Sequence, residues 1–141
     1  MSEEIKVKPE RVYVVAKTTL ENNIDFFKFV AQNAFSIFAE VPSVNFEVAQ
    51  LSKSCTNFEI EIPSAEDDLA NDKIRLAKNE FDEFASDVVS KVTNFSRENY
   101  DEVSSEQTLK AEEYITILEE TKASADGVFA LMSDCTNEMT L

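Results

Sequence analysis

A seven-residue repeat of large apolar residues constrains the fold of this chain more than any other feature of its sequence. The repeated residues, together with one neighbour on the same side, form what we call the apolar stripe: Ile74, Phe81, Phe84, Val88 and Phe95. At this spacing all of them lie on one side of an α-helix. No Gly or Pro interrupts residues 64–103, and Ser64 followed by Asp67 is typical of a helix start. The stripe therefore predicts one long central helix over about residues 64–103.

Other segments show helical periodicity as well. Thr18 with Glu21 indicates a helix that Pro42 ends, a shorter apolar repeat follows from Val44 to Cys55, and Ser104 with Gln107 indicates a last helix. A single Gly and three Pro in 141 residues are typical of helical proteins. We expect an all-α fold, an antiparallel helical bundle around the central helix, in a single domain over residues 1–141. Its loose ends are expected at about 1–10 and 134–141.

Two short segments also fit extended structure. Residues 11–17 are rich in β-branched side chains and predict either a short strand or the start of the first helix. Residues 57–62 alternate apolar and acidic side chains, which is a strand pattern. The two segments could pair as a small two-strand ribbon, or 57–62 could be an extended connector that ends at Pro63. We favour the connector.

The net charge of −15, with 28 acidic and 13 basic residues, limits the choice of partners. Such a surface repels nucleic-acid phosphates and anionic lipids, so we expect no nucleic-acid partner. No apolar run reaches the length of a membrane-spanning helix, and no secretory signal is recognisable. Cys55 and Cys135 lie far apart in the sequence and are interpreted as two free thiols of a cytoplasmic protein.

The chain contains no His, which removes the commonest general base and the commonest metal ligand. Its paired acidic residues, such as Glu112–Glu113, point in different directions on a helix. We therefore predict no catalytic, metal-binding or cofactor-binding residues, and no enzyme.

Apolar surface is what remains for function. The helix that follows Thr18 has a wide, Phe-rich apolar face, and its candidate partner-binding residues are Phe26, Phe27, Phe29, Val30, Phe35 and Phe38. Phe29 lies off the main apolar side and is the residue that an internal core explains least. The apolar stripe would suit a neighbouring chain as well as the chain's own helices, so we expect a homo-oligomer. Lys91 within that region disfavours a regular coiled coil.

The order of segments resembles that of phasins, the small helical proteins that coat bacterial polyhydroxyalkanoate granules. The resemblance covers about residues 20–120 and includes NNIDFFKFVAQNAF, NFEVAQLSKSC and AKNEFDEFASDVVSKVTNFSRENYDEV. Within the last segment, Phe95, Ser96, Arg97 and Tyr100 fit a run that is common in the family's second long helix. The resemblance implies a non-catalytic coat protein that binds a hydrophobic polymer granule through an amphipathic helix.

Two other functions are compatible with the sequence. A compact acidic chain could inhibit a basic protein by mimicking DNA, with binding that weakens as salt increases. A helical adaptor or chaperone could instead present a groove to a partner protein.

Overall fold

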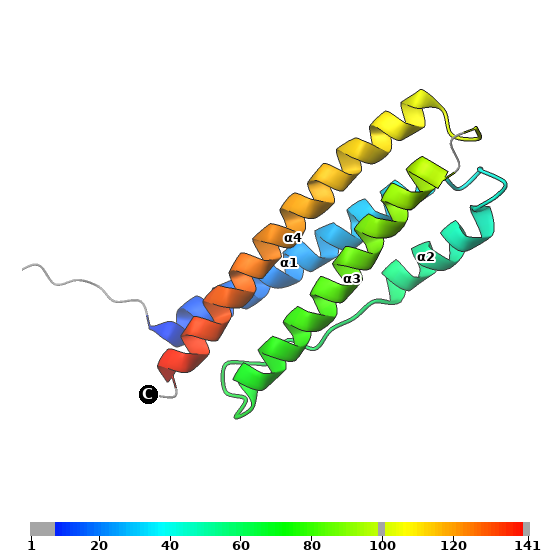
Figure 1. The fold of residues 1–141 in the computed structure, drawn as a ribbon. Helices are drawn as coiled ribbons and strands as arrows, with labels where there is room; N and C mark the ends of the chain where they lie inside the picture. The colour runs from blue at the N-terminus through cyan, green and yellow to red at the C-terminus, as the bar shows by residue number, and fades with distance from the viewer. Residues whose placement is uncertain (1–7, 99–100, 140–141) are drawn as a thin grey trace, which may run out of the picture.

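The computed structural model describes residues 8–98 and 101–139, and these residues form four α-helices and no strand. The helices are α1 (Pro9–Ser36), α2 (Asn45–Asn57), α3 (Ala70–Glu98) and α4 (Ser105–Met139). Figure 1 shows α1, α3 and α4 as three long rods lying side by side, with α4 antiparallel to the other two. The expected all-α bundle is confirmed.

The short helix α2 and the connector after it take the fourth position in the bundle. Residues 37–44 turn the chain back along α1, and α2 packs against α1. Residues 58–69 then continue in the same direction to the start of α3 (Figure 1). The fourth position in the bundle is therefore filled partly by the helix α2 and partly by the non-helical residues 58–69. The bundle has three long helices of 28, 29 and 35 residues in place of the one central helix that we expected.

The possible two-strand ribbon does not form, because residues 11–17 belong to α1. Pro9 occupies the first helical turn, where its missing N–H costs nothing. Tyr13, Ala16 and Leu20 then follow at helical spacing and are buried. Burying these side chains in the core outweighs the weak helix propensity of the β-branched residues between them.

The extended connector is confirmed over residues 58–62, since Asn57 is the last residue of α2, and the packing explains its alternating pattern. Phe58, Ile60 and Ile62 are partly buried against the core, whereas Glu59 and Glu61 are exposed. The ring of Phe58 stacks on Phe84 of α3, with centroids 3.9 Å apart and planes 6° from parallel. Extended chain presents alternate side chains to one side, so the pattern needs no partner strand.

Side-chain hydrogen bonds to the backbone hold the connector in place. The Tyr13 hydroxyl donates to the buried Pro63 carbonyl at 2.6 Å, and Lys28 Nζ donates to the Phe58 carbonyl at 2.7 Å. Both donors come from α1. They satisfy carbonyl groups that have no helical partner.

Helix α3 begins at Ala70, six residues later than expected. Ser64 and Asp67 form a turn, in which the Asp67 amide donates to the Ser64 carbonyl at 3.2 Å. The Asp67 carboxylate then accepts from the Leu69 amide at 2.8 Å and from Lys73 Nζ at 2.7 Å. The residue that caps the start of α3 is therefore Asp67 rather than Ser64. The helix is described up to Glu98, and Asp101 and Glu102 lie in a turn.

The N-terminus of α4 follows the prediction from sequence. Ser104 and Gln107 form a reciprocal pair: the Ser104 amide donates to Gln107 Oε1 at 2.8 Å, and the Gln107 amide donates to Ser104 Oγ at 3.1 Å. At the other end, α4 continues to Met139 through residues that we expected to be loose, because Cys135 and Thr136 are buried. Of the N-terminal segment 1–10, residues 1–7 lie outside the described residues.

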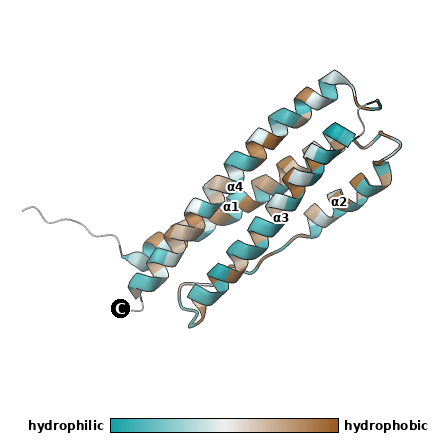
Figure 2. Cartoon of the chain, in the orientation of Figure 1, coloured by the Kyte–Doolittle hydropathy of each residue, from teal (hydrophilic) through white to brown (hydrophobic). Residues whose placement is uncertain are grey.

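Aromatic rings from three helices build the core. Phe27 of α1 meets Phe81 of α3 edge to face, with centroids 5.4 Å apart, and Phe81 contacts Phe129 of α4 at 6.2 Å. Near the C-terminal end of α3, the ring of Phe95 packs between the rings of Phe35 and Phe38. In Figure 2 the visible outer turns of α3 are mostly teal, and much of the brown colour lies on α1 behind them. The wide apolar side of α1 is thus mainly core.

Candidate binding surface

The six candidate residues, five on α1 and Phe38 in the turn after it, divide into a buried and an exposed group. The buried residues are Phe27, Val30, Phe35 and Phe38. Phe26 and Phe29, by contrast, are 50% and 60% exposed. Only these two of the six can meet a partner while the bundle stays closed.

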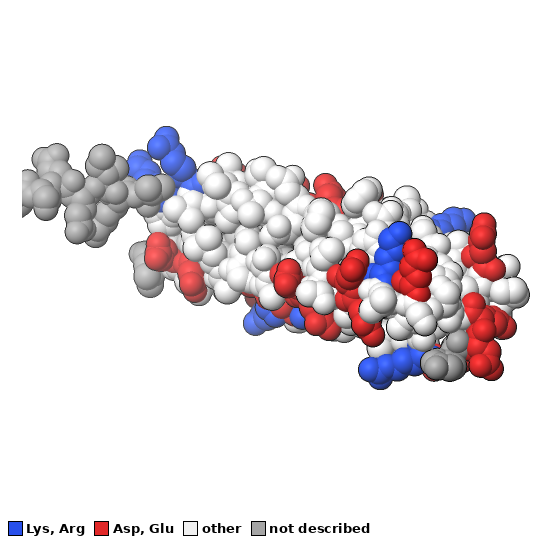
Figure 3. Space-filling model, turned by 90° about the horizontal axis from the view of Figure 1, so that it is seen from above, with Lys and Arg blue, Asp and Glu red and all other residues white. Residues whose placement is uncertain are grey.

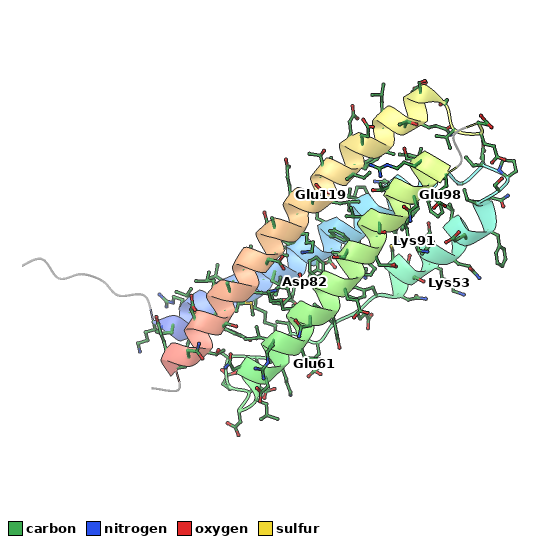
Figure 4. The ribbon with its side chains drawn as sticks, in the orientation of Figure 1. Lys53, Glu61, Asp82, Lys91, Glu98 and Glu119 are labelled. Carbon is green, nitrogen blue, oxygen red and sulfur yellow. The ribbon has the colours of Figure 1, made fainter. Side chains whose placement is uncertain are left out.

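The apolar stripe of α3 is occupied within the chain. Ile74, Phe81, Val88 and Phe95 are buried against the other helices, and Phe84 is half-buried beneath Phe58. Lys91 does not interrupt this packing, because its Nζ turns toward α2 and lies 3.4 Å from the Glu47 carboxylate (Figure 4). The stripe is therefore not free to pair with a second chain. Tyr100, part of the resemblance to phasins, lies outside the described residues.

The exposed side of α1 carries a long row of uncharged side chains with one basic residue, which we call the outer face of α1. At 100° per residue its members share one side of the helix, opposite the core. They are Arg11, Val15, Thr18, Thr19, Asn22, Phe26, Phe29 and Asn33. Of the acidic residues of α1, Glu10 and Glu21 point to other sides of the helix, whereas exposed Asp25 lies at the edge of this face, about 20° from Thr18. Val15 is 62% exposed, so this face carries three large apolar side chains.

A shallow apolar groove extends this face toward α4. It has a volume of about 340 Å³, and its lining is Arg11, Val12, Val15, Ala16, Thr19, Val128 and Leu131. Apart from Arg11, no charged residue lines it. The groove adds the edge of α4 to the apolar surface of α1.

Charged side chains are spread unevenly over the side of the molecule that is uppermost in Figure 1. Figure 3 shows uncharged residues over much of the middle of this side, with acidic side chains gathered along the lower edge and at the right end. Basic side chains lie at the upper left and also among the acidic ones at the right.

A second hollow differs in chemistry from the first. It lies over the stacked rings of Phe58 and Phe84, has a volume of about 380 Å³, and is bordered by Glu80, Glu83 and Asp87. Aromatic rings together with carboxylates are the surroundings that a cationic side chain prefers.

A ladder of alternating charges joins α3 to α4. Lys78 Nζ lies 2.7 Å from Asp82, and Lys122 Nζ lies 3.5 Å from Asp82 and 3.2 Å from Asp126. Asp82 is on the edge of α3 that faces α4 (Figure 4). Burial and the neighbouring Asp82 carboxyl raise the pKa of Asp126. Burial raises the pKa of Asp82, but hydrogen bonding with Asp126 and Lys78 and the charges of Lys122 and Lys78 together lower it below its ordinary value. Of these contacts, only that of Lys122 with Asp82 crosses from α4 to α3.

The two cysteines are placed as structural residues. Cys55 and Cys135 are free and buried, and burial raises the pKa of Cys55 to about 11 and the pKa of Cys135 above its ordinary value. Neither thiol is therefore prepared to act as a nucleophile. Among the residues that the structure describes, none of the acidic and cysteine side chains gather into a group that could hold a metal ion. Within the same ranges, each helix is too short or too polar to cross a membrane.

Sequence reasoning found Phe29 but missed Val15 and the groove beside it. Residues 11–17 were compatible with a strand, and in a strand Val15 does not share a face with Phe29. The signal was nevertheless present, because positions 15, 18, 19, 22, 26, 29 and 33 are all uncharged at helical spacing. The hollow over Phe58 and Phe84 depends on how the connector packs, and no local pattern reveals it.

Comparison of the chain with protein-family models, with curated proteins and with solved structures found no match in any of the three. The function has to be argued from the surface itself.

Proposed function

We propose that this protein is a non-catalytic binding protein that attaches to an apolar surface through the outer face of α1. The resemblance to phasins indicates which surface this is: a polyhydroxyalkanoate granule in the cytoplasm. One observation carries the proposal, namely that Phe26 and Phe29 are at least half exposed on a largely uncharged helix face, with Asp25 at its edge, in a chain of net charge −15.

The distribution of charge suits attachment to an apolar phase. Placing an ionised carboxylate against a polymer would remove its water without providing a partner, which is costly. On the outer face of α1 the only nearby carboxylate is Asp25, at the edge of the face, where it can keep its water, and Val15, Phe26 and Phe29 gain from leaving water. The acidic residues on the rest of the molecule then remain hydrated and repel neighbouring coated particles.

Attachment does not require the bundle to open. Phe27 and Phe35 are fully buried and contact rings of α3, so releasing them would sacrifice much of the core. Phe26 and Phe29 are already exposed. We therefore propose that α1 binds as part of the closed bundle.

Co-sedimentation with polyhydroxybutyrate particles tests the proposal. We expect wild type to bind, the double variant Phe26→Asp/Phe29→Asp to lose binding by at least about tenfold, and Leu76→Asp to bind like wild type. Leu76 on α3 is a matched control because it is 59% exposed, compared with 60% for Phe29. Equal binding by all three proteins, or none by wild type, would overturn the proposal. Circular dichroism checks that each variant is folded.

A second candidate function rests on the hollow over Phe58 and Phe84. A lysine or arginine side chain of a basic partner protein could stack on the rings and pair with Glu80, Glu83 or Asp87. This reading corresponds to an acidic protein-binding inhibitor. This function predicts that the protein binds an arginine-rich peptide, and that both added salt and Glu83→Gln weaken the binding. Attachment to a neutral polymer would instead persist in salt.

A further inference from the structure

We propose that an extended, basic segment of a partner protein binds beside residues 58–62, with its main chain hydrogen-bonded to the main chain of this connector. The site lies between the connector and α1, and it uses different residues from the outer face of α1. The pairing therefore does not rest on attachment to a granule. Three features support it: the unpaired backbone of the connector, the hollow beside it and the charges around that hollow.

The backbone of the connector has hydrogen-bonding groups that the fold leaves unused. Within the described residues, no hydrogen bond reaches the amides or the carbonyls of residues 59–62. The flanking carbonyls of Phe58 and Pro63, by contrast, each accept from a side chain of α1. An extended segment with unpaired amides and carbonyls is the kind of edge to which a peptide adds as a further strand.

The side chains of the connector leave this edge open. Ile60 and Ile62 are directed to the core, whereas Glu59 and Glu61 are exposed. In extended chain the backbone amides and carbonyls point sideways, at right angles to the side chains, and alternate residues direct them to the same side. One edge of residues 59–62 therefore presents the backbone groups of two alternate residues to a neighbouring segment.

A hollow beside the connector provides room for such a segment. Its volume is about 280 Å³, and it is lined on one side by α1 and on the other by Phe58, Glu59, Ile60 and Ile62. The hollow thus runs along the same residues whose backbone groups are unpaired. A short extended peptide placed there lies next to the connector and within reach of α1.

The charges around the hollow favour a basic segment. Glu21 and Asp25 of α1 and Glu59 of the connector border it, and all three are exposed. In the described part of the chain none of these carboxylates has an ion-pair partner. Lys28 also lines the hollow, but its Nζ donates to the Phe58 carbonyl at 2.7 Å. Main-chain pairing then provides the binding, and the carboxylates select lysine and arginine.

Amide hydrogen exchange, measured by NMR on the full chain with an octapeptide of alternating lysine and valine, tests the pairing. Binding should slow exchange at least about tenfold at alternate connector amides, either 59 and 61 or 60 and 62, because one edge is paired. The same peptide N-methylated at every residue keeps its charge but cannot donate from its main chain, so it should not bind. Absence of binding by the first peptide, binding without this protection, or binding of both peptides would overturn the proposal.

Charge variants test the selection of a basic segment. Asp25→Asn/Glu59→Gln should weaken peptide binding about fivefold, since two carboxylates at the hollow are lost. Glu112→Gln/Glu113→Gln removes the same charge from exposed positions of α4, which does not line the hollow, and should bind like wild type at physiological ionic strength. Equal weakening by both double variants would contradict the proposal, as would weakening by Glu83→Gln alone, which belongs to the other hollow. Since no polymer is present, either failure leaves attachment to the granule standing.

Discussion

At the scale of single residues, Tyr13 shows how one hydrogen bond joins an irregular segment to a helix. Its ring is fully buried, and its hydroxyl donates to the buried carbonyl of Pro63 at 2.6 Å. Burial, with a smaller effect from the charge of Asp67, raises the pKa of Tyr13 from 10.0 to about 12. Tyr13 therefore fixes the connector and also resists ionisation.

Replacing Tyr13 with Phe tests this role. We expect Tyr13→Phe to lower the free energy of unfolding by about 1–3 kcal/mol, because the Pro63 carbonyl loses its partner. Because the pKa is raised in the folded state, the contribution of Tyr13 is fully present below pH 10 and is lost as pH rises through about 12. The stability difference between wild type and variant, measured by urea unfolding, should therefore shrink over that range. A difference that does not change with pH would contradict this role.

The charge ladder between α3 and α4 predicts opposite effects for two neighbouring carboxylates. Asp126→Asn should raise the free energy of unfolding at neutral pH. The pKa of Asp126 is raised by burial and by the neighbouring Asp82 carboxyl, so its ionised form is unfavourable in the folded state, and the substitution removes that charge. Asp82→Asn should lower it, because Asp82 accepts from Lys78 and also lies 3.5 Å from Lys122. Thermal unfolding of the two variants at pH 7 measures both effects. If both substitutions shifted the stability in the same direction, the unequal roles of the two carboxylates would be disproved.

At the scale of elements, the start of α4 depends on its reciprocal cap. Ser104→Ala should reduce the free energy of unfolding by about 1 kcal/mol, because the Gln107 amide loses its acceptor. Ser105→Ala provides a control, since Ser105 is the exposed first residue of the helix and alanine favours helix. Denaturant titration of the two variants measures the difference. Equal losses would show that the cap does not stabilise α4.

Elements were predictable where the local sequence and the tertiary packing agree. The stripe from Ile74 to Phe95 has one periodicity and one burial pattern, so its helix was recognised. The cap at Ser104 and Gln107 was found for the same reason. Residues 11–17 were ambiguous because their β-branched side chains favour strand, and only packing against the bundle makes them helical. The start of α3 was placed too early, because Ser64 and Asp67 resemble a cap but form a turn.

The candidate surface was predictable only in part. Eleven Phe in a short chain indicate that some rings must be exposed or shared, and Phe29 was identified by its position off the apolar side. Which of the others are buried depends on how the neighbouring helices surround α1. Phe26 and Phe27 are adjacent in the sequence, yet one is half exposed and the other fully buried. The angular position of two neighbouring helices decides this difference, and the sequence of α1 alone does not contain it.

At the scale of the whole molecule, charge and apolar surface are separated. Figure 3 shows a side of the bundle on which uncharged side chains cover much of the middle and acidic side chains gather along one edge and at one end. A molecule arranged in this way can attach by an uncharged area and remain hydrated elsewhere, which supports attachment to a polymer.

The most direct test of the binding face is a tryptophan placed on it. The chain contains no Trp, so Phe29→Trp and the control Leu76→Trp each carry a single fluorescent reporter. Polyhydroxybutyrate particles should shift the emission of Phe29→Trp to shorter wavelength and leave Leu76→Trp unchanged. An unchanged spectrum for Phe29→Trp, or the same shift at both positions, would contradict the claim that the outer face of α1 enters the apolar phase.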